Sequence, residues 1–113
     1  MHIPRDAVLL RIFMDENAKH DGTPLFEAIV LAARNHHMAG ATVLRGPMGF
    51  GHSSRLHTAK ILRLSEDLPM VVEIIDGPER VEAFLPVIEP MIGEHGLVTL
   101  EKVQVLRYGP TKS

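Results

Sequence analysis

Two strand-length segments of the sequence carry apolar side chains on both of their faces, and this constrains the fold more than any other feature. The segments are Ala7–Met14 and Leu68–Asp76. Successive residues of a β-strand point to opposite sides of the sheet, so apolar residues at both odd and even positions favour burial on both sides. We therefore predict that these two strands form the middle of one sheet.

A first helix is predicted over Leu25–Met38. Thr23 offers a capping hydroxyl, Pro24 suits the first turn, and Gly40 supplies a stop. The residues that recur with helical spacing, and are expected to face the core, are Leu25, Ile29, Ala32 and His36.

A second helix is predicted to begin at Gly77-Pro78. Pro86 and Pro90 each remove a backbone donor, so we expect a kink or an early end. A turn at Gly93–Gly96 follows. The core stripe expected on this helix is Val81, Phe84, Leu85, Ile88 and Ile92.

Two further strands complete the pattern, Ala41–Arg45 and Leu97–Tyr108, with a bulge expected near Glu101-Lys102. The order β-α-β-β-α-β predicts an α+β, ferredoxin-like sandwich with two helices on one face of an antiparallel sheet. We expect a single domain over residues 1–113. Because two helices cover only one face, the other apolar face is expected to pack against copies of the chain.

Composition and sequence pattern exclude several classes of function. Twelve Lys and Arg residues against fourteen Asp and Glu residues leave a net charge of −2, which argues against a nucleic-acid partner. The absence of cysteine excludes disulfides, thiolate nucleophiles and zinc sites built on sulfur. No nucleophile with an activating base is evident, so we expect no enzyme activity. Without an h-region or a run of ~18 apolar residues, a cytoplasmic location is expected.

A long connection, residues 46–67, separates the second and third predicted strands and is rich in groups that bind anions. Its glycines allow a close approach of the backbone, its serines offer hydroxyls, and its cations can meet negative charge. The alternative is a flexible glycine-rich loop with solvated charges. The candidate binding residues in and beside it are Arg45, Gly46, Gly49, Phe50, Gly51, His52, Ser53, Ser54 and Arg55.

Further candidates lie outside that loop. The turn at Gly93, His95 and Gly96 offers backbone donors, although a tight helix-to-strand connection would use the same residues. Arg107 stands near the end of the last predicted strand, where it could meet an anion or remain solvated. A competing hypothesis is a metal- or small-ion-binding module that uses His52, His57 and His95.

The chain resembles the PII-like proteins, most closely the branch called domain of unknown function 190. The likeness covers nearly the whole chain. The resemblance implies a ferredoxin-like protomer in a homotrimer, and a non-enzymatic sensor that binds an adenine nucleotide between subunits and regulates a membrane transporter or channel. The segments that carry the likeness are LLRIFMDEN (Leu9–Asn17), PLFEAIVLAAR (Pro24–Arg34), AGATVLRGPMGFG (Ala39–Gly51), SSRLHTAKILRLSEDLPMVVEIID (Ser53–Asp76) and GLVTLEKVQV (Gly96–Val105).

Carried onto this chain, the resemblance implies a role for three segments. Residues 46–67 would be the regulatory loop, Gly93–Gly96 the phosphate-binding turn, and Arg107 a phosphate partner. PII proteins have a lysine in that turn, whereas this chain has Glu94 and His95. The tyrosine that is modified in some PII loops has no counterpart in residues 46–67.

Overall fold

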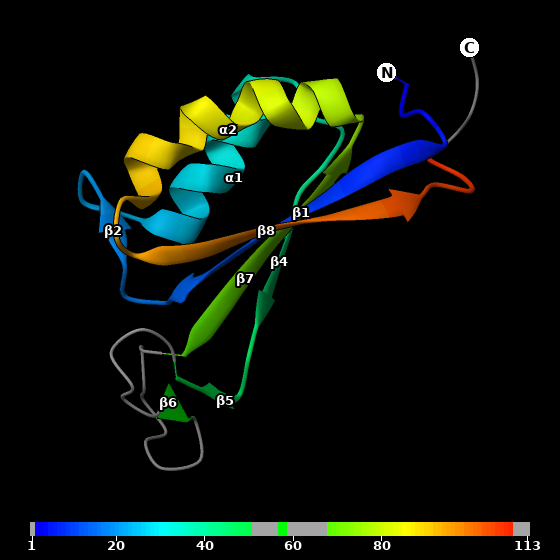
Figure 1. Cartoon of the computed structure of the whole chain (residues 1–113). Coiled ribbons are helices and arrows are strands. Elements are labelled where there is room, and N and C mark those ends of the chain that lie inside the picture. Colours follow the sequence, from blue (N-terminus) through cyan, green and yellow to red (C-terminus); the bar gives the residue numbers. More distant parts are fainter. Residues whose placement is uncertain (1, 51–56, 59–67, 110–113) are drawn as a thin grey trace.

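The computed structural model describes residues 2–50, 57–58 and 68–109. Two helices lie on one face of a four-stranded antiparallel sheet, as the sequence predicts for a ferredoxin-like sandwich (Figure 1). The helices are α1 (Leu25–Asn35) and α2 (Pro78–Ile92). The sheet, in the order β4-β7-β1-β8, consists of β4 (Thr42–Arg45), β7 (Pro69–Asp76), β1 (Asp6–Asp15) and β8 (Gly96–Gln104).

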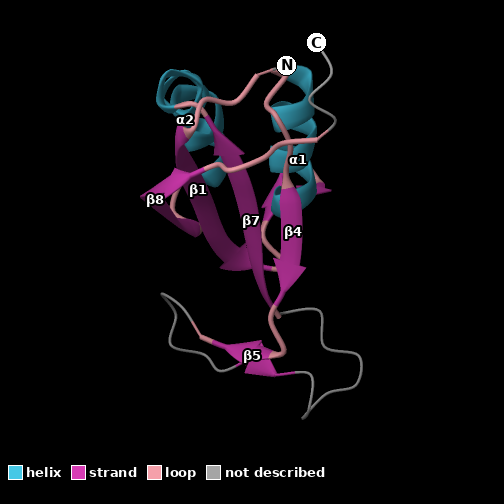
Figure 2. Ribbon diagram, turned by 90° about the vertical axis from the view of Figure 1, so that its right-hand side faces the viewer, coloured by secondary structure: helices cyan, strands magenta, loops and turns pink. Residues whose placement is uncertain are grey.

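Two short hairpins stand outside this sheet. One pairs β2 (Lys19–His20) with β3 (Thr23–Pro24), and the other pairs β5 (Met48–Gly49) with β6 (His57–Thr58). The second hairpin lies beyond the end of the sheet, within the predicted long connection (Figures 1 and 2).

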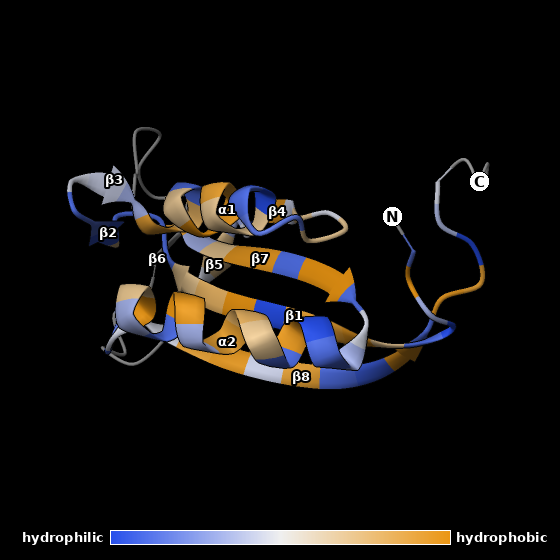
Figure 3. Cartoon of the chain, turned by 90° about the horizontal axis from the view of Figure 1, so that it is seen from above, coloured by the Kyte–Doolittle hydropathy of each residue, from blue (hydrophilic) through white to orange (hydrophobic). Residues whose placement is uncertain are grey.

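The predicted central position of the two apolar strands is confirmed, because β7 and β1 occupy the middle of the sheet. Helices α1 and α2 lie over these two strands (Figure 3), and the even-numbered residues of both strands belong to the buried core. The helices contribute Ile29, Phe84 and Ile88, all at most 2% exposed. The strand residues of this core are Leu10, Ile12, Met14, Met70, Val72 and Ile74.

The opposite face of the sheet is also apolar, and within the described residues neither helix covers it. Phe13 pairs with Val71 on one side and Leu97 on the other, and Leu9 pairs with Ile75. Phe13 is 36% exposed, Ile75 39% and Leu97 59%. We call the side chains on this face, from Leu9, Phe13, Leu44, Val71, Ile75 and Leu97, the open face.

One charged cluster crosses the middle of the open face. Arg11 Nε donates to Glu73 Oε2 at 2.8 Å, and Arg11 Nη1 lies 3.2 Å from Glu101 Oε1. The hydrogen bond to Glu73 raises the pKa of Arg11, desolvation opposes this, and the charges of Glu73 and Glu101 add to the increase. Arg11 is therefore a permanent cation between two carboxylates.

The start of α1 differs from the prediction. Thr23 and Pro24 belong to β3, Pro24 is the N-cap, and no side chain caps the helix. Asp21 and Gly22 form the hairpin turn with φ of 51° and 81°, so the chain turns back before the helix begins. The amide of Leu25 consequently bonds to the carbonyl of Ala18 at 2.8 Å.

The end of α1 also differs, because the helix stops at Asn35, well before Gly40. Met38 N donates to Ala33 O and His37 N to Arg34 O, which is the Schellman arrangement, and His37 adopts φ of 59° where glycine is usual. The core residue of the last turns is Ala33 rather than Ala32, and His36 is exposed. Burial of Met38 sets this end.

Helix α2 begins as predicted, with Gly77 at the N-cap and Pro78 in the first turn. The expected early end is wrong, since the helix continues through Pro86 and Pro90 to Ile92. Both prolines are exposed, so their rings displace no side chain of the core. Val81, Phe84, Ile88 and Ile92 are buried as expected, and Leu85 is partly buried.

Strand β8 is shorter than predicted and has no bulge. It ends at Gln104, and its register against β1 is unbroken from Gly96, opposite Met14, to Gln104, opposite Asp6. The apolar residues of this segment change from even positions, Val98 and Leu100, to odd positions, Val103 and Val105, without a bulge. The reason is that β8 is an edge strand exposed on both sides, so burial does not set its pattern.

Asp76 is the one fully buried acidic residue among the described residues, and it joins three elements. At the end of β7, its Oδ1 accepts from Gly77 N at 2.7 Å, and its Oδ2 accepts from Ala39 N at 2.9 Å and Arg80 Nε at 3.1 Å. Arg80 also donates to the carbonyl of His37. The carboxylate therefore ties β7 to the start of α2 and to the α1–β4 connection.

We predict that Asp76→Asn lowers the free energy of unfolding by about 2–4 kcal/mol. The amide nitrogen of Asn would replace one acceptor oxygen and face a donor instead. Urea unfolding at fixed protein concentration measures the change, with Glu82→Gln on the exposed surface of α2 as the control. A loss for Asp76→Asn no greater than for the control would contradict this role.

Candidate functional site

Arg45, at the end of β4, lies where the predicted regulatory loop leaves the sheet. Its Nη2 is 2.9 Å from Glu16 Oε1, and its side chain is 51% exposed. Glu16 follows β1 and its amide bonds to the carbonyl of Leu68. An anion that approaches Arg45 would therefore have to compete with the Glu16 carboxylate.

Gly46 and Gly49 have a packing role that the sequence does not reveal. A Cβ on Gly46 would lie 3.0 Å from Pro69 Cγ, and one on Gly49 would lie 3.1 Å from the same atom. The amide of Gly46 also bonds to the carbonyl of Pro69 at 2.8 Å. A methyl group at either position would therefore press on the Pro69 ring, which would have to move by a few tenths of an ångström.

The rest of the predicted loop site is only partly placed. Phe50 follows β5 and is 68% exposed, which makes it an available contact for a ligand or a partner. The backbone of His57 pairs with that of Gly49. The candidates that lie outside the described residues are Gly51, His52, Ser53, Ser54 and Arg55.

The predicted phosphate-binding turn connects α2 to β8. Gly93 ends the helix with φ of 54°, and the amide of His95 bonds to the carbonyl of Ile92 at 2.9 Å. Glu94 and His95 are exposed. A Cβ on Gly96 would lie 2.9 Å from Ile92 Cγ2 and 3.0 Å from the carbonyl oxygen of Phe13, so close packing also requires glycine there.

The turn and the loop base share one end of the sheet. Met70 pairs with both Arg45 and Met14, and Met14 pairs with Gly96. Three strand spacings separate Arg45 from Gly96, or about 14 Å. A ligand that touches both must span the width of the sheet within one copy.

Arg107 lies at the opposite end of the molecule. The sequence predicted Arg107 within the last strand, but β8 ends at Gln104, so Arg107 lies in the segment that follows the strand. The nine residues of β8 extend about 30 Å. One copy of the chain therefore cannot bring Arg107 to its own Gly93–Gly96 turn.

Of the three histidines in the metal hypothesis, His95 is the one whose side chain lies within the described residues. Among them no group of three or more His, Asp or Glu side chains could hold a metal ion. His95 stands alone on the turn, and the side chains of His52 and His57 are not part of the description.

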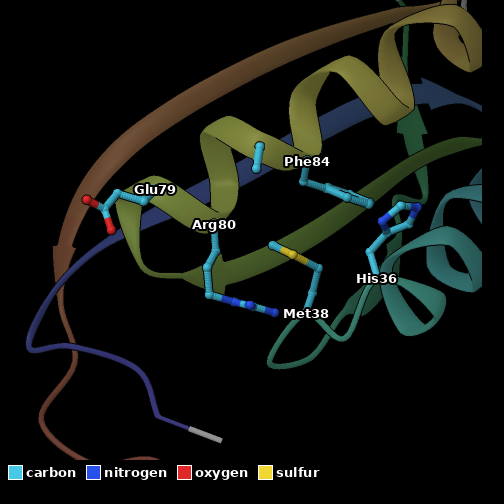
Figure 4. A pocket seen from close by; sticks show the side chains of 6 residues that line it. His36, Met38, Glu79, Arg80 and Phe84 are labelled. Carbon is cyan, nitrogen blue, oxygen red and sulfur yellow. The ribbon is translucent and has the colours of Figure 1, made fainter.

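A small hollow of about 210 Å³ lies between the end of α1 and the first half of α2 (Figure 4). Phe84 and His36 meet in it edge to face, with ring centroids 6.0 Å apart. Its cation, Arg80, is already bonded to Asp76 and to the carbonyl of His37. None of the predicted binding residues lines the hollow.

The sequence of the chain matches a known protein family over most of its length. The family model DUF190, described as Uncharacterized ACR, matches residues 7–105. The chain belongs to the DUF190 family. A UPF0166 protein of Aquifex aeolicus (strain VF5) is 39% identical over 99 residues, which are 87% of this chain and 91% of that protein. A UPF0166 protein of Methanocaldococcus jannaschii is 29% identical over 89% of this chain and 93% of the relative.

Solved structures show that this DUF190 chain has the PII-like fold. CPII, a nitrogen regulatory PII-like protein from Thiomonas intermedia K12 bound to ADP, AMP and bicarbonate, superposes with a TM-score of 0.68 at 19% identity, covering 90% of each chain. A protein of Thermus thermophilus described as a PII-like signaling protein gives 0.64 at 17% identity, covering 92% of this chain and 93% of its own. The predicted family and fold are both confirmed.

Sequence reasoning missed three features of the DUF190 chain. The Asp21-Gly22 pair is a strong hairpin signal and could have indicated the β2–β3 hairpin. The ion pair of Arg45 with Glu16, and the structural role of Asp76, had no local signal because their partners lie far away in sequence.

No helix of the described residues is long and apolar enough to span a membrane.

We predict that Gly96→Ala lowers the free energy of unfolding by about 1–3 kcal/mol, because the new methyl group would overlap Ile92 and the Phe13 carbonyl. Gly40→Ala is the matched control, since no atom lies within 4 Å of the corresponding position. It should change stability by less than about 0.5 kcal/mol. Equal effects of the two substitutions in urea unfolding would contradict the packing role of Gly96.

Proposed function

We propose that this chain is a non-enzymatic, cytoplasmic PII-like regulatory protein. It assembles as a homotrimer and binds an adenine nucleotide or another small anion in clefts between subunits. Residues 46–67 carry the signal to a partner, a membrane transporter or channel. The observation that carries the proposal is an uncovered apolar sheet face on a PII-like fold.

The open face supports self-assembly. Its exposed members Phe13, Ile75, Leu44 and Leu97 come from all four strands of the sheet, so the apolar surface is continuous rather than scattered. Surfaces of this kind mark interaction sites. A second copy is a fitting occupant because closed symmetric assemblies are the usual form of soluble oligomers. The Arg11 cluster in its centre would fix the register of the subunits.

The separation of the binding candidates supports sites between subunits. Arg107 and the Gly93–Gly96 turn lie at opposite ends of β8, so an anion can meet both only where two copies adjoin. Such a cleft would combine backbone donors from one copy with a guanidinium from the next. The nucleotides and bicarbonate bound to CPII, which has the same fold, indicate the class of ligand to test first.

The charge of the turn determines how strongly it binds anions. Glu94 is exposed at a position where its carboxylate would repel a phosphate, and the turn contains no lysine. We therefore expect weaker binding of highly charged nucleotides than in a turn that contains lysine, and a larger share of the affinity from Arg107.

We predict that light scattering gives three times the 12.5 kDa chain mass for the wild type. Leu97→Glu should shift the mass toward the monomer while the helical signal in circular dichroism is retained, because this side chain is already 59% exposed in one copy. Leu31→Glu, on an α1 leucine that is 45% exposed on the helix layer, is the matched control. A wild-type mass of one chain at micromolar concentration would overturn the assembly.

We predict that calorimetry of the wild-type oligomer detects binding in a panel of AMP, ADP, ATP and cyclic dinucleotides. Glu94→Gln should strengthen that binding about 3–10-fold at low salt, and less as salt is added, since it removes one repulsive charge. Glu82→Gln is the control, because 82 and 94 are separated by most of α2. No heat with any nucleotide from an intact oligomer would refute nucleotide sensing.

A further inference from the structure

The chain that follows β8 is fixed at two points. Val105 N donates to Arg5 O at 2.8 Å, beside the start of β1. Three residues later, Tyr108 Oη donates to Ala39 O at 2.6 Å, in the connection between α1 and β4. Figure 2 shows this segment crossing from β8, past the ends of β1 and β7, toward α1 and β4. We call residues 105–108 the C-terminal strap.

The anchor of the strap is itself held firmly. Ala39 offers its carbonyl to Tyr108, and its amide bonds to the fully buried carboxylate of Asp76 at 2.9 Å. Asp76 also receives bonds from Gly77 and Arg80. The tyrosine hydroxyl thus attaches the strap to a residue whose own amide is bonded to the buried Asp76 carboxylate.

The strap presents its middle residues outward. Leu106 is 81% exposed and Arg107 is exposed, while Tyr108, at 38%, lies partly against the protein. Without the bond from Tyr108, the backbone after Val105 would have no anchor that the described residues show. Arg107 would then sample many positions, and an anion would have to order it on binding.

We propose that Tyr108 is a positioning residue for Arg107. Its hydroxyl holds the strap so that the guanidinium of Arg107 in one copy is already directed at the phosphate group of a nucleotide in the turn of the next copy. The inference rests on the proposed function, since it assumes a nucleotide between subunits. It adds a residue that touches no ligand and acts only through its neighbour.

A double-mutant cycle tests this role, with calorimetry of ADP binding as the readout. Arg107→Ala should weaken binding about 10-fold or more. Tyr108→Phe, which removes only the hydroxyl, should weaken binding about 3–10-fold when Arg107 is present. In the Arg107→Ala background the same substitution should have no effect. A loss of equal size in both backgrounds, or no loss in either, would overturn the proposal.

A second measurement requires no ligand. The backbone order parameters of Leu106 and Arg107 from ¹⁵N relaxation should fall in Tyr108→Phe, while those of β1 and β7 remain unchanged. Unchanged order parameters at both strap residues would overturn the positioning role. A wild type that binds no nucleotide of the panel would overturn the nucleotide proposal together with this one, whereas normal ADP binding by Tyr108→Phe would overturn this one alone.

Discussion

The structure depends on one constraint: its two central strands, β1 and β7, are apolar on both faces, while both helices of the described residues lie on the same side of the sheet. The helices close that face with Ile29, Phe84 and Ile88, and the part of the chain that the structure describes leaves the other face exposed. Burial of apolar area stabilises by roughly 25 cal/mol per Å². Burial of the open face against a copy of the chain would therefore stabilise the proposed assembly, and the Arg11 cluster within that face would favour one arrangement of the subunits.

The second interaction on which the fold depends is the set of hydrogen bonds to the Asp76 carboxylate. This carboxylate joins the start of α2 to segments that are distant in the sequence. It satisfies the amide of Gly77 at the start of α2, the amide of Ala39 in the α1–β4 connection, and the guanidinium of Arg80. A buried acid is tolerated because each of its bonds is made. Through Ala39 the same network reaches Tyr108, so the helix layer and the C-terminal strap share one anchor.

The candidate site is distributed rather than assembled in one copy. The loop base at Arg45 and Gly46 shares one end of the sheet with the Gly93–Gly96 turn, and Arg107 occupies the other end. Several glycines that look like ligand contacts also pack closely, against Pro69 for Gly46 and Gly49 and against Ile92 for Gly96. If the proposed site is correct, ligand binding and close packing would both depend on these glycines.

The sequence alone determined the order of the two helices and the four strands of the main sheet, the central pair of strands and the start of α2, because side-chain alternation, helical spacing and the Gly77-Pro78 pair are local signals. Only the tertiary structure decided that two short hairpins stand outside the sheet, that α1 ends at Asn35, that α2 runs through two prolines, and that β8 keeps its register. Those outcomes depend on the burial of Met38, the exposure of Pro86 and Pro90, and pairing with β1. Such contacts join residues far apart in the chain, and no local pattern encodes them.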